Sequence, residues 1–264
     1  MTFENIKIES ADPGIRIVKI ARPKALNALN SATMRELKTA LKIEADNVET
    51  RVVILTGEGE KSFIAGADIA EMKDQSASDG VVFSQLGHEV AKLLELMPKP
   101  TIAAVNGFVL GGGLEMAMAC DFIVASDNAV FGQPEVGLGV IPGFGGTIRL
   151  SKYVGIPLAK ELIFSGRKLK AEEAKSIGLA QHVWAQAEFM TRVLDLARSI
   201  SSQSGLAVSR AKALMNEFSE TVGLNYKVDA ESHAFGHMFG TADQQEGMAA
   251  FLEKRKPKFQ GLNQ

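Results

Sequence analysis

Glu115 is the first residue in this chain that could do chemistry, because it follows three consecutive glycines inside an otherwise uncharged stretch, residues 105–120. An ionised, unpaired carboxylate costs free energy in apolar surroundings, so its pKa is expected to rise there. Glycines 111–113 let a ligand approach main-chain N–H groups, which are unpaired and carry partial positive charge where a helix begins. The stretch therefore offers an acid or base beside donors for a developing anion.

Glu135 is a second carboxylate, and it also lies among glycine and apolar residues. Two carboxylates in one apolar pocket have pKa values that are pushed apart, which supplies one acid and one base. Spacing alone leaves open the alternative that Glu115 and Glu135 are unrelated glutamates, each in its own salt bridge.

Two corners rich in small residues, 65–68 and 111–113, could each present main-chain donors at a strand-to-helix turn. An N–H group from each corner, converging on one oxygen, would form an oxyanion hole. Either corner taken alone is more often an ordinary tight turn.

The elements that position these residues are predicted from periodicity and turn signals. Apolar residues at helical spacing indicate an amphipathic helix from a cap at Asn30 or Ser31 to about residue 46. Residues 51–57 are typical of a buried strand that ends in a glycine loop. The other predicted elements are a hairpin of 6–9 and 15–20, a helix at 79–97, strands at 101–105, 121–125 and 129–132, and helices at 145–153, 157–164, 171–177, 187–202, 205–218, 223–238 and 243–254.

The alternation of strand, glycine corner and helix indicates stacked βα units and an α/β fold. Beyond Gly143 the strand signal fades and helical patterns dominate. We therefore predict a core domain at 1–200 and a C-terminal helical region at 201–264, whose apolar faces are expected to pack on another subunit.

Composition excludes several classes of function. The 264 residues are 46% hydrophobic and 23% charged, with a net charge of −2, so no field favours nucleic acid or an anionic membrane. Cys120 is the single cysteine, which fits a reducing compartment, and residues 1–5 lack the features of a secretion signal. We expect a cytoplasmic protein with residues 101–120 in its core.

Three weaker patterns do not change this interpretation. His233 and His237 have the spacing of metal ligands on a helix, but no third ligand is near in the sequence, so no metal site is expected. Residues 251–258 form a cationic tail, which is usually a solvated helix end although it could contact a phosphate. Three acidic residues, Glu36, Glu44 and Asp46, interrupt the short basic stripe of the first helix, so RNA binding is the less favoured alternative.

Five ordered motifs carry a resemblance to a known family. The motifs are 22–29, 63–69, 106–115, 131–147 and 243–257. In this order they resemble the enoyl-CoA hydratase (crotonase) family, and most of all its short-chain enoyl-CoA hydratases.

The resemblance implies a crotonase-like ββα superhelix, a spiral core, with a C-terminal helical trimerisation region and assembly as a homotrimer or a homohexamer built from two trimers. It assigns the oxyanion hole to the N–H groups of Ala67 and Gly112, the two catalytic carboxylates to Glu115 and Glu135, and a position against the catalytic water to Gly143. It also implies a set of residues that hold the coenzyme A part of the substrate: Lys24, Ala25, Leu26, Ala65, Asp68, Ile69, Phe251 and Lys254.

The implied activity is reversible addition of water to a 2-trans-enoyl-CoA, a step of fatty acid β-oxidation, with an acyl-CoA thioester as substrate and no separate cofactor. The nearest alternative is an enoyl-CoA isomerase, which resembles the same fold but generally keeps one carboxylate. This chain departs from many members at Ala21 and Ile148, and Phe144 is expected to narrow the acyl pocket and to favour short chains.

Overall fold

The computed structural model describes residues 2–217, 232–233, 235–238 and 241–260. Its chain begins with an antiparallel hairpin of β1 (Ile6–Asp12) and β2 (Ile15–Ile20), followed by helix α1 (Ser31–Asp46). Asn30 is the N-cap of α1, and its side chain accepts a hydrogen bond of 2.8 Å from the Thr33 N–H. The predicted hairpin and the predicted capped helix are therefore confirmed.

The next part of the chain makes repeated turns of long strand, short strand and helix. These elements are β3 (Val52–Gly57), β4 (Ser62–Ile64), α2 (Ile69–Met72), α3 (Ala77–Leu96), β5 (Thr101–Val105), β6 (Phe108–Leu110), α4 (Gly112–Ala119), β7 (Phe122–Ser126), β8 (Val130–Gly132), the 3₁₀ helix η2 (Glu135–Leu138) and α5 (Gly146–Val154). Each turn adds its long strand to one sheet and its short strand to another, which is the ββα spiral.

The two sheets have the strand orders β1-β2-β3-β5-β7-β10 and β4-β6-β8-β9. Within the first sheet, every pair except β1–β2 is parallel, as crossover connections require. Because the side chains of a strand alternate between faces, β3 contributes to two hydrophobic clusters. One cluster packs against α1, α3 and α4, and the other packs against helix α8 (Phe189–Ser201).

The second half of the chain departs from the prediction in two places. Helices α6 (Ile156–Ser165), α7 (Ala171–Ser176) and α8 lie close to their predicted ranges. However, strands β9 (Lys168–Lys170) and β10 (His182–Trp184) extend the two sheets where only helical patterns were predicted. Each has only three residues, so its sequence is too short to show an alternating pattern, and pairing with β8 and β7 decides its conformation.

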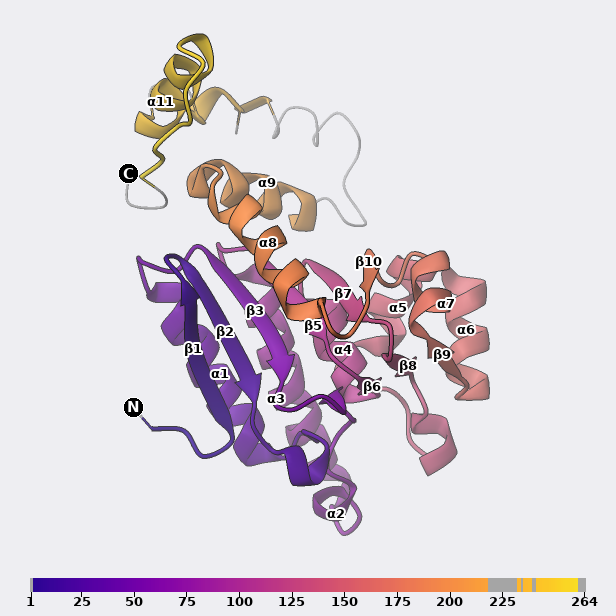
Figure 1. Ribbon diagram of the computed structural model, residues 1–264. Helices are drawn as coiled ribbons and strands as arrows, with labels where there is room; N and C mark the ends of the chain where they lie inside the picture. The colour runs from indigo at the N-terminus through magenta and orange to yellow at the C-terminus, as the bar shows by residue number, and fades with distance from the viewer. Residues whose placement is uncertain (1, 218–231, 234, 239–240, 261–264) are drawn as a thin grey trace.

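The C-terminal region contains helices α9 (Gly205–Glu217) and α11 (Ala242–Leu252). They lie at the end of the molecule opposite α2 (Figure 1). Most of the helix predicted at 223–238 lies outside the described residues, and the division of the chain at residue 200 stays a prediction. No helix in the described ranges has the length and apolar character needed to cross a membrane.

Candidate active site

Helix α4 carries Glu115 into the interior of the protein. The preceding Gly111 has a positive φ of 50°, which turns the chain from β6 into the helix. A Cβ at Gly113 would lie only 2.0 Å from the Ile64 carbonyl oxygen, so glycine allows α4 to approach β4. The three glycines therefore allow helix α4 to pack closely against the sheet and allow the chain to turn sharply into its first turn.

Glu115 is 1% exposed and is held by main-chain donors. Its Oε1 accepts hydrogen bonds from the N–H groups of Phe144, at 2.8 Å, and Gly146, at 2.6 Å. Burial raises the pKa of Glu115, while these hydrogen bonds and the nearby charge of Arg149 oppose the rise. These two donors fix one carboxylate oxygen, and Glu115 lines a cavity.

Glu135 begins η2 and lies against the same glycine corner. Its Oε1 is 3.0 Å from the position that a Cβ would take on Gly111. Burial raises the pKa of Glu135 to about 7, and the negative charge of Glu115 adds to this rise. The predicted pair is thus brought together, and among the residues that the structure describes neither glutamate forms a salt bridge of its own.

The N–H groups of Ala67 and Gly112 lie close together. A Cβ on Gly112 would be 3.8 Å from the Ala67 nitrogen. Within the described part of the chain, neither N–H has a hydrogen-bond acceptor. The Gly112 N–H belongs to the first turn of α4, where helical N–H groups have no partner in the helix. Two unpaired donors on neighbouring corners are the arrangement that an oxyanion hole needs.

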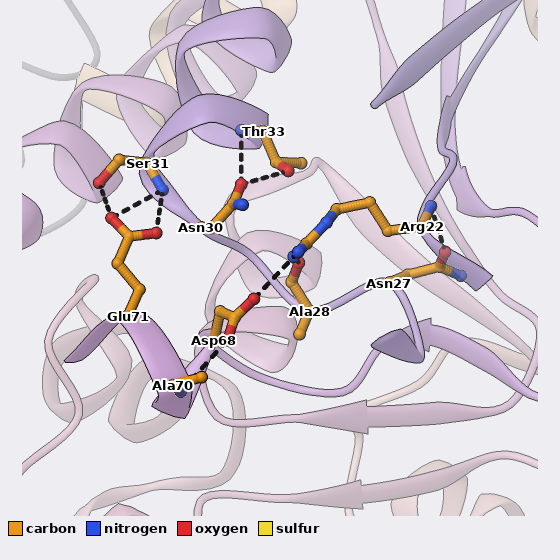
Figure 2. Close-up of polar contacts among 9 residues, drawn as sticks. All are labelled: Arg22, Asn27, Ala28, Asn30, Ser31, Thr33, Asp68, Ala70 and Glu71. Atoms are coloured by element: carbon orange, nitrogen blue, oxygen red, sulfur yellow. Dashed lines mark hydrogen bonds and ion pairs between the residues drawn. The ribbon is translucent and has the colours of Figure 1, made fainter. Parts of the chain in front are cut away.

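The Ala67 corner is fixed by the segment that precedes α1. Leu29 forms a parallel bridge with Ala67, and its N–H and C=O bond to Gly66 and Asp68 at 2.9 and 2.8 Å. Figure 2 shows that Arg22 also joins the two segments, through an ion pair of 3.0 Å with Asp68. This network holds the Ala67 N–H in place.

A cavity of about 850 Å³ contains most of the predicted site. Its lining includes the following predicted residues: Ala65, Ala67, Ile69, Gly112, Glu115, Glu135 and Gly143. The volume is in the range of small-molecule and cofactor sites.

The other predicted contacts with coenzyme A lie outside this lining. Lys24 and Ala25 belong to a short 3₁₀ helix, Pro23–Ala25, and the Leu26 carbonyl accepts a 3.1 Å hydrogen bond from the Ala65 N–H. This loop therefore adjoins the rim of the cavity. The Asp68 side chain is engaged by Arg22 and by the Ala70 N–H, and its main-chain N–H donates to the Leu29 carbonyl. The predicted contact of Asp68 with coenzyme A therefore stays a prediction.

The structure does not bring the C-terminal candidates to the cavity. Lys254 follows α11, at the end of the molecule opposite α2, whose first residue, Ile69, lines the cavity (Figure 1). The side chain of Phe251 lies outside the described residues. Contacts of these two positions with coenzyme A therefore stay a prediction, and Lys254 is not among the residues that line the cavity with the two carboxylates.

Three functional contacts were not predicted from the sequence. The buried amide of Gln133, oriented with its nitrogen toward Glu135, donates to both carboxylate oxygens at 2.7 and 3.0 Å. Ser84 Oγ donates to the Gly143 carbonyl at 2.5 Å, and Arg149 donates to the Phe144 carbonyl at 2.9 Å. Gln133 lies two residues before Glu135 in the motif at 131–147, which is the one signal that could have identified it.

Comparison with known proteins identifies relatives over the full chain. A family model described as "Enoyl-CoA hydratase/isomerase" matches residues 10–263. The chain is 49% identical over 261 residues to the short-chain-enoyl-CoA hydratase of Clostridium acetobutylicum, which covers 97% of each protein. It is 48% identical over 259 residues to the crotonyl-CoA hydratase of Syntrophomonas wolfei, covering 98% of this chain and 99% of the relative.

Solved structures agree with this result. The crystal structure of an enoyl-CoA hydratase from Bacillus anthracis superimposes with a TM-score of 0.94 at 37% identity, covering 98% of this chain and 100% of that one. A Geobacillus kaustophilus structure gives a TM-score of 0.91 at 39% identity, covering 98% and 99% of the two chains.

Proposed function

The chain belongs to the enoyl-CoA hydratase/isomerase family, and from this premise we propose that it is an enoyl-CoA hydratase that acts on short 2-trans-enoyl-CoA thioesters. It is an enzyme of the hydro-lyase class, and the reaction is the hydration step of fatty acid β-oxidation. The observation that carries the proposal is the pair Glu115 and Glu135, which line one cavity beside two unpaired N–H donors.

The reaction adds water across the C2–C3 double bond of the thioester. As the water oxygen bonds to C3 and gives up a proton, the π electrons move through C2 to the thioester oxygen. The resulting enolate then takes a proton at C2. We assign the enolate oxygen to the N–H groups of Ala67 and Gly112, each of which contributes on the order of 3 kcal/mol.

The two carboxylates handle the protons. One accepts the proton of the attacking water, and the other supplies the proton that bonds to C2. Glu135 has a pKa of about 7, so it can gain or lose a proton near neutral pH, where general acid–base catalysis is most effective. The addition involves no net oxidation or reduction, and we expect it to need no cofactor besides the coenzyme A of the substrate.

Phe144 supports the assignment to short acyl chains. Phe144 is 3% exposed and lines the cavity, and the centroid of its ring lies 5.4 Å from that of Phe83. A Cβ at Gly87 would lie 2.1 Å from its Cδ1 atom, so the ring fills the space above that helical glycine. The two aromatic rings thereby limit the depth available to an acyl tail.

We also infer that the chain assembles as a homotrimer or a pair of trimers. Lys254 is not among the residues that line the cavity, and α11, which it follows, lies at the end of the molecule opposite α2 (Figure 1), so we assign its predicted contact with coenzyme A to a neighbouring subunit. The mass of the purified protein by light scattering tests this inference, and a monomer would contradict it.

A turnover assay separates hydratase from isomerase. With crotonyl-CoA, a hydratase removes the absorbance of the conjugated thioester and forms 3-hydroxybutyryl-CoA. Retention of that absorbance, together with conversion of a 3-enoyl-CoA to its 2-enoyl isomer, would identify an isomerase instead.

A further inference from the structure

Arg149, on helix α5, lies behind the turn that holds Glu115. Its side chain is 12% exposed. Nη1 donates a 2.9 Å hydrogen bond to the Phe144 carbonyl, and Nη2 donates a 2.8 Å hydrogen bond to Oε2 of Glu95 on α3. The guanidinium of Arg149 thus connects Glu95 on α3 to the main chain of the turn at Phe144.

The same turn supplies both donors to the buried carboxylate. The Phe144 peptide unit donates its N–H to Glu115, while the Phe144 carbonyl accepts from Arg149. Gly146, the first residue of α5, provides the second N–H. A continuous series of polar contacts therefore runs from Glu95 through Arg149 and Phe144 to Glu115.

The turn needs such an anchor because the chain before it is exposed and rich in glycine. Residues 136–141 are exposed, and Gly139 and Gly145 have φ values of 76° and 104°. A Cβ on Gly145 would lie 2.2 Å from Nη1 of Arg149, so the guanidinium passes directly against that glycine. Arginine suits this place, because its planar group has donors in a fixed arrangement.

We propose that Arg149, anchored by Glu95, is a positioning residue for Glu115: it fixes the turn at 144–146 so that both N–H groups direct the carboxylate toward the substrate. The proposal rests on the proposed hydratase function. A positioning role differs from that of a purely structural ion pair in one respect: loss of Arg149 lowers the rate of the chemical step more than it weakens substrate binding or folding.

Other contacts keep α3 docked when this ion pair is changed. Asn216 on α9 donates a 2.7 Å hydrogen bond to the Glu95 carbonyl. Lys212 on the same helix donates to the carbonyls of Leu94, at 3.1 Å, and Lys99, at 3.0 Å. The Glu95 main chain is therefore held independently of its carboxylate, which makes Glu95→Gln a mild variant.

The test compares Arg149→Met, Arg149→Lys and Glu95→Gln with the wild-type enzyme in crotonyl-CoA turnover. We expect Arg149→Met to lower kcat about 10- to 100-fold with little change in KM, because a small displacement of a catalytic group costs that much. Glu95→Gln should lower kcat less. Arg149→Lys should restore part of the loss, since it keeps one donor and the charge.

Arg198→Met is the matched control. Arg198 also bonds two partners, Asp12 and Asp195, each at 2.8 Å, but it lies on α8, on the other face of the large sheet. We expect its kcat and KM to equal those of the wild type. The thermal midpoint of every variant is recorded at the same protein concentration.

Chemical rescue gives a second readout that a structural role would not produce. Arg149 lines a separate cavity of about 520 Å³ between α9 and the core, from which a small cation can reach its place. Millimolar guanidinium chloride should raise kcat of Arg149→Ala, whereas potassium chloride at equal concentration should not.

Two results would overturn the proposal. One is wild-type kcat in Arg149→Met and Glu95→Gln. The other is a fall in kcat that is matched by a rise in KM and a lower thermal midpoint, without rescue by guanidinium or lysine. If Arg149→Met does not fold, Arg149→Lys and Glu95→Gln decide between these outcomes. A wild-type enzyme without hydratase activity would instead contradict the proposed function.

Discussion

Glu115 and Glu135 are the same side chain held in two different ways. Glu115 lies on a buried helix, and two main-chain N–H groups bind one of its oxygens. Glu135 begins a 3₁₀ turn whose next residues are exposed, and the side-chain amide of Gln133 is its donor. The difference indicates that main-chain donors fix the position of the Glu115 carboxylate, whereas the surroundings of Glu135 adjust its affinity for a proton.

The pKa shifts follow the same division. Burial raises the pKa of both carboxyl groups. At Glu115, the main-chain hydrogen bonds and the charge of Arg149 oppose that rise. At Glu135, the negative charge of Glu115 adds to the rise that burial causes.

Removal of either charge should have the largest effect. Glu115→Gln and Glu135→Gln keep the size of the side chain but cannot transfer a proton, so we expect each to lower kcat by about 100- to 10,000-fold. Affinity for a coenzyme A thioester should change little, as measured by calorimetry with a product. Near-normal turnover in either variant would remove that residue from the mechanism.

Shortening the side chains should separate the two sites. Glu115→Asp withdraws the carboxylate from the N–H groups of Phe144 and Gly146, and the buried helix α4, which carries residue 115, cannot move to follow. Glu135→Asp acts on an exposed turn that can move by the length of one methylene. We expect the loss of kcat to be at least about tenfold greater at position 115, in line with the cost of misplacement. Equal losses would contradict the comparison.

Removal of the Phe144 ring should lengthen the acyl pocket. We expect Phe144→Ala to raise the ratio of kcat/KM for octenoyl-CoA to that for crotonyl-CoA by about tenfold or more, since one methylene in a pocket is worth roughly 10- to 200-fold. Phe164→Ala, at an exposed phenylalanine, is the control. An unchanged ratio would show that another group limits chain length.

The smallest predicted effect is on stability. A carboxyl whose pKa is raised from 4.5 to about 7 by folding stabilises the fold below pH 4.5, and this contribution is lost as pH rises through 7. Glutamine does not ionise, so the thermal midpoint of Glu135→Gln should rise relative to wild type by a few degrees between pH 4 and pH 8, at roughly 2–4 °C per kcal/mol. A difference independent of pH would contradict the raised pKa.

Much of the fold was predictable because its signals are local. The cap at Asn30 and the turn glycine at Gly14 lie next to the elements that they limit. Helix α3 begins at Ala77, two residues before the predicted start, because Ser76 and Asp79 form a capping box that was not recognised. Strands β4, β6, β9 and β10 were missed, whereas β8, which is equally short, was predicted; three residues carry little periodicity, so sheet pairing decides their conformation.

Part of the site was also predictable, because the signals of its two carboxylates are local in the sequence. Glu115 and Glu135 are recognisable as charged residues in apolar segments, and the family resemblance indicated their roles. Arg149 and Ser84 carry no such mark, because charged or polar residues on helices are usually solvated. Their importance depends on which main-chain carbonyl they meet in the folded chain.

The most direct test of the account is isotope incorporation into the product of crotonyl-CoA. In water labelled with ¹⁸O and deuterium, the wild-type enzyme should place one ¹⁸O on C3 and one deuterium on C2, and Glu115→Gln and Glu135→Gln should slow both equally. Two results would contradict the claim that this carboxylate pair adds water to an enoyl thioester. One is ¹⁸O in a free carboxylic acid, which would indicate hydrolysis of the thioester, and the other is deuterium in the product without ¹⁸O at C3.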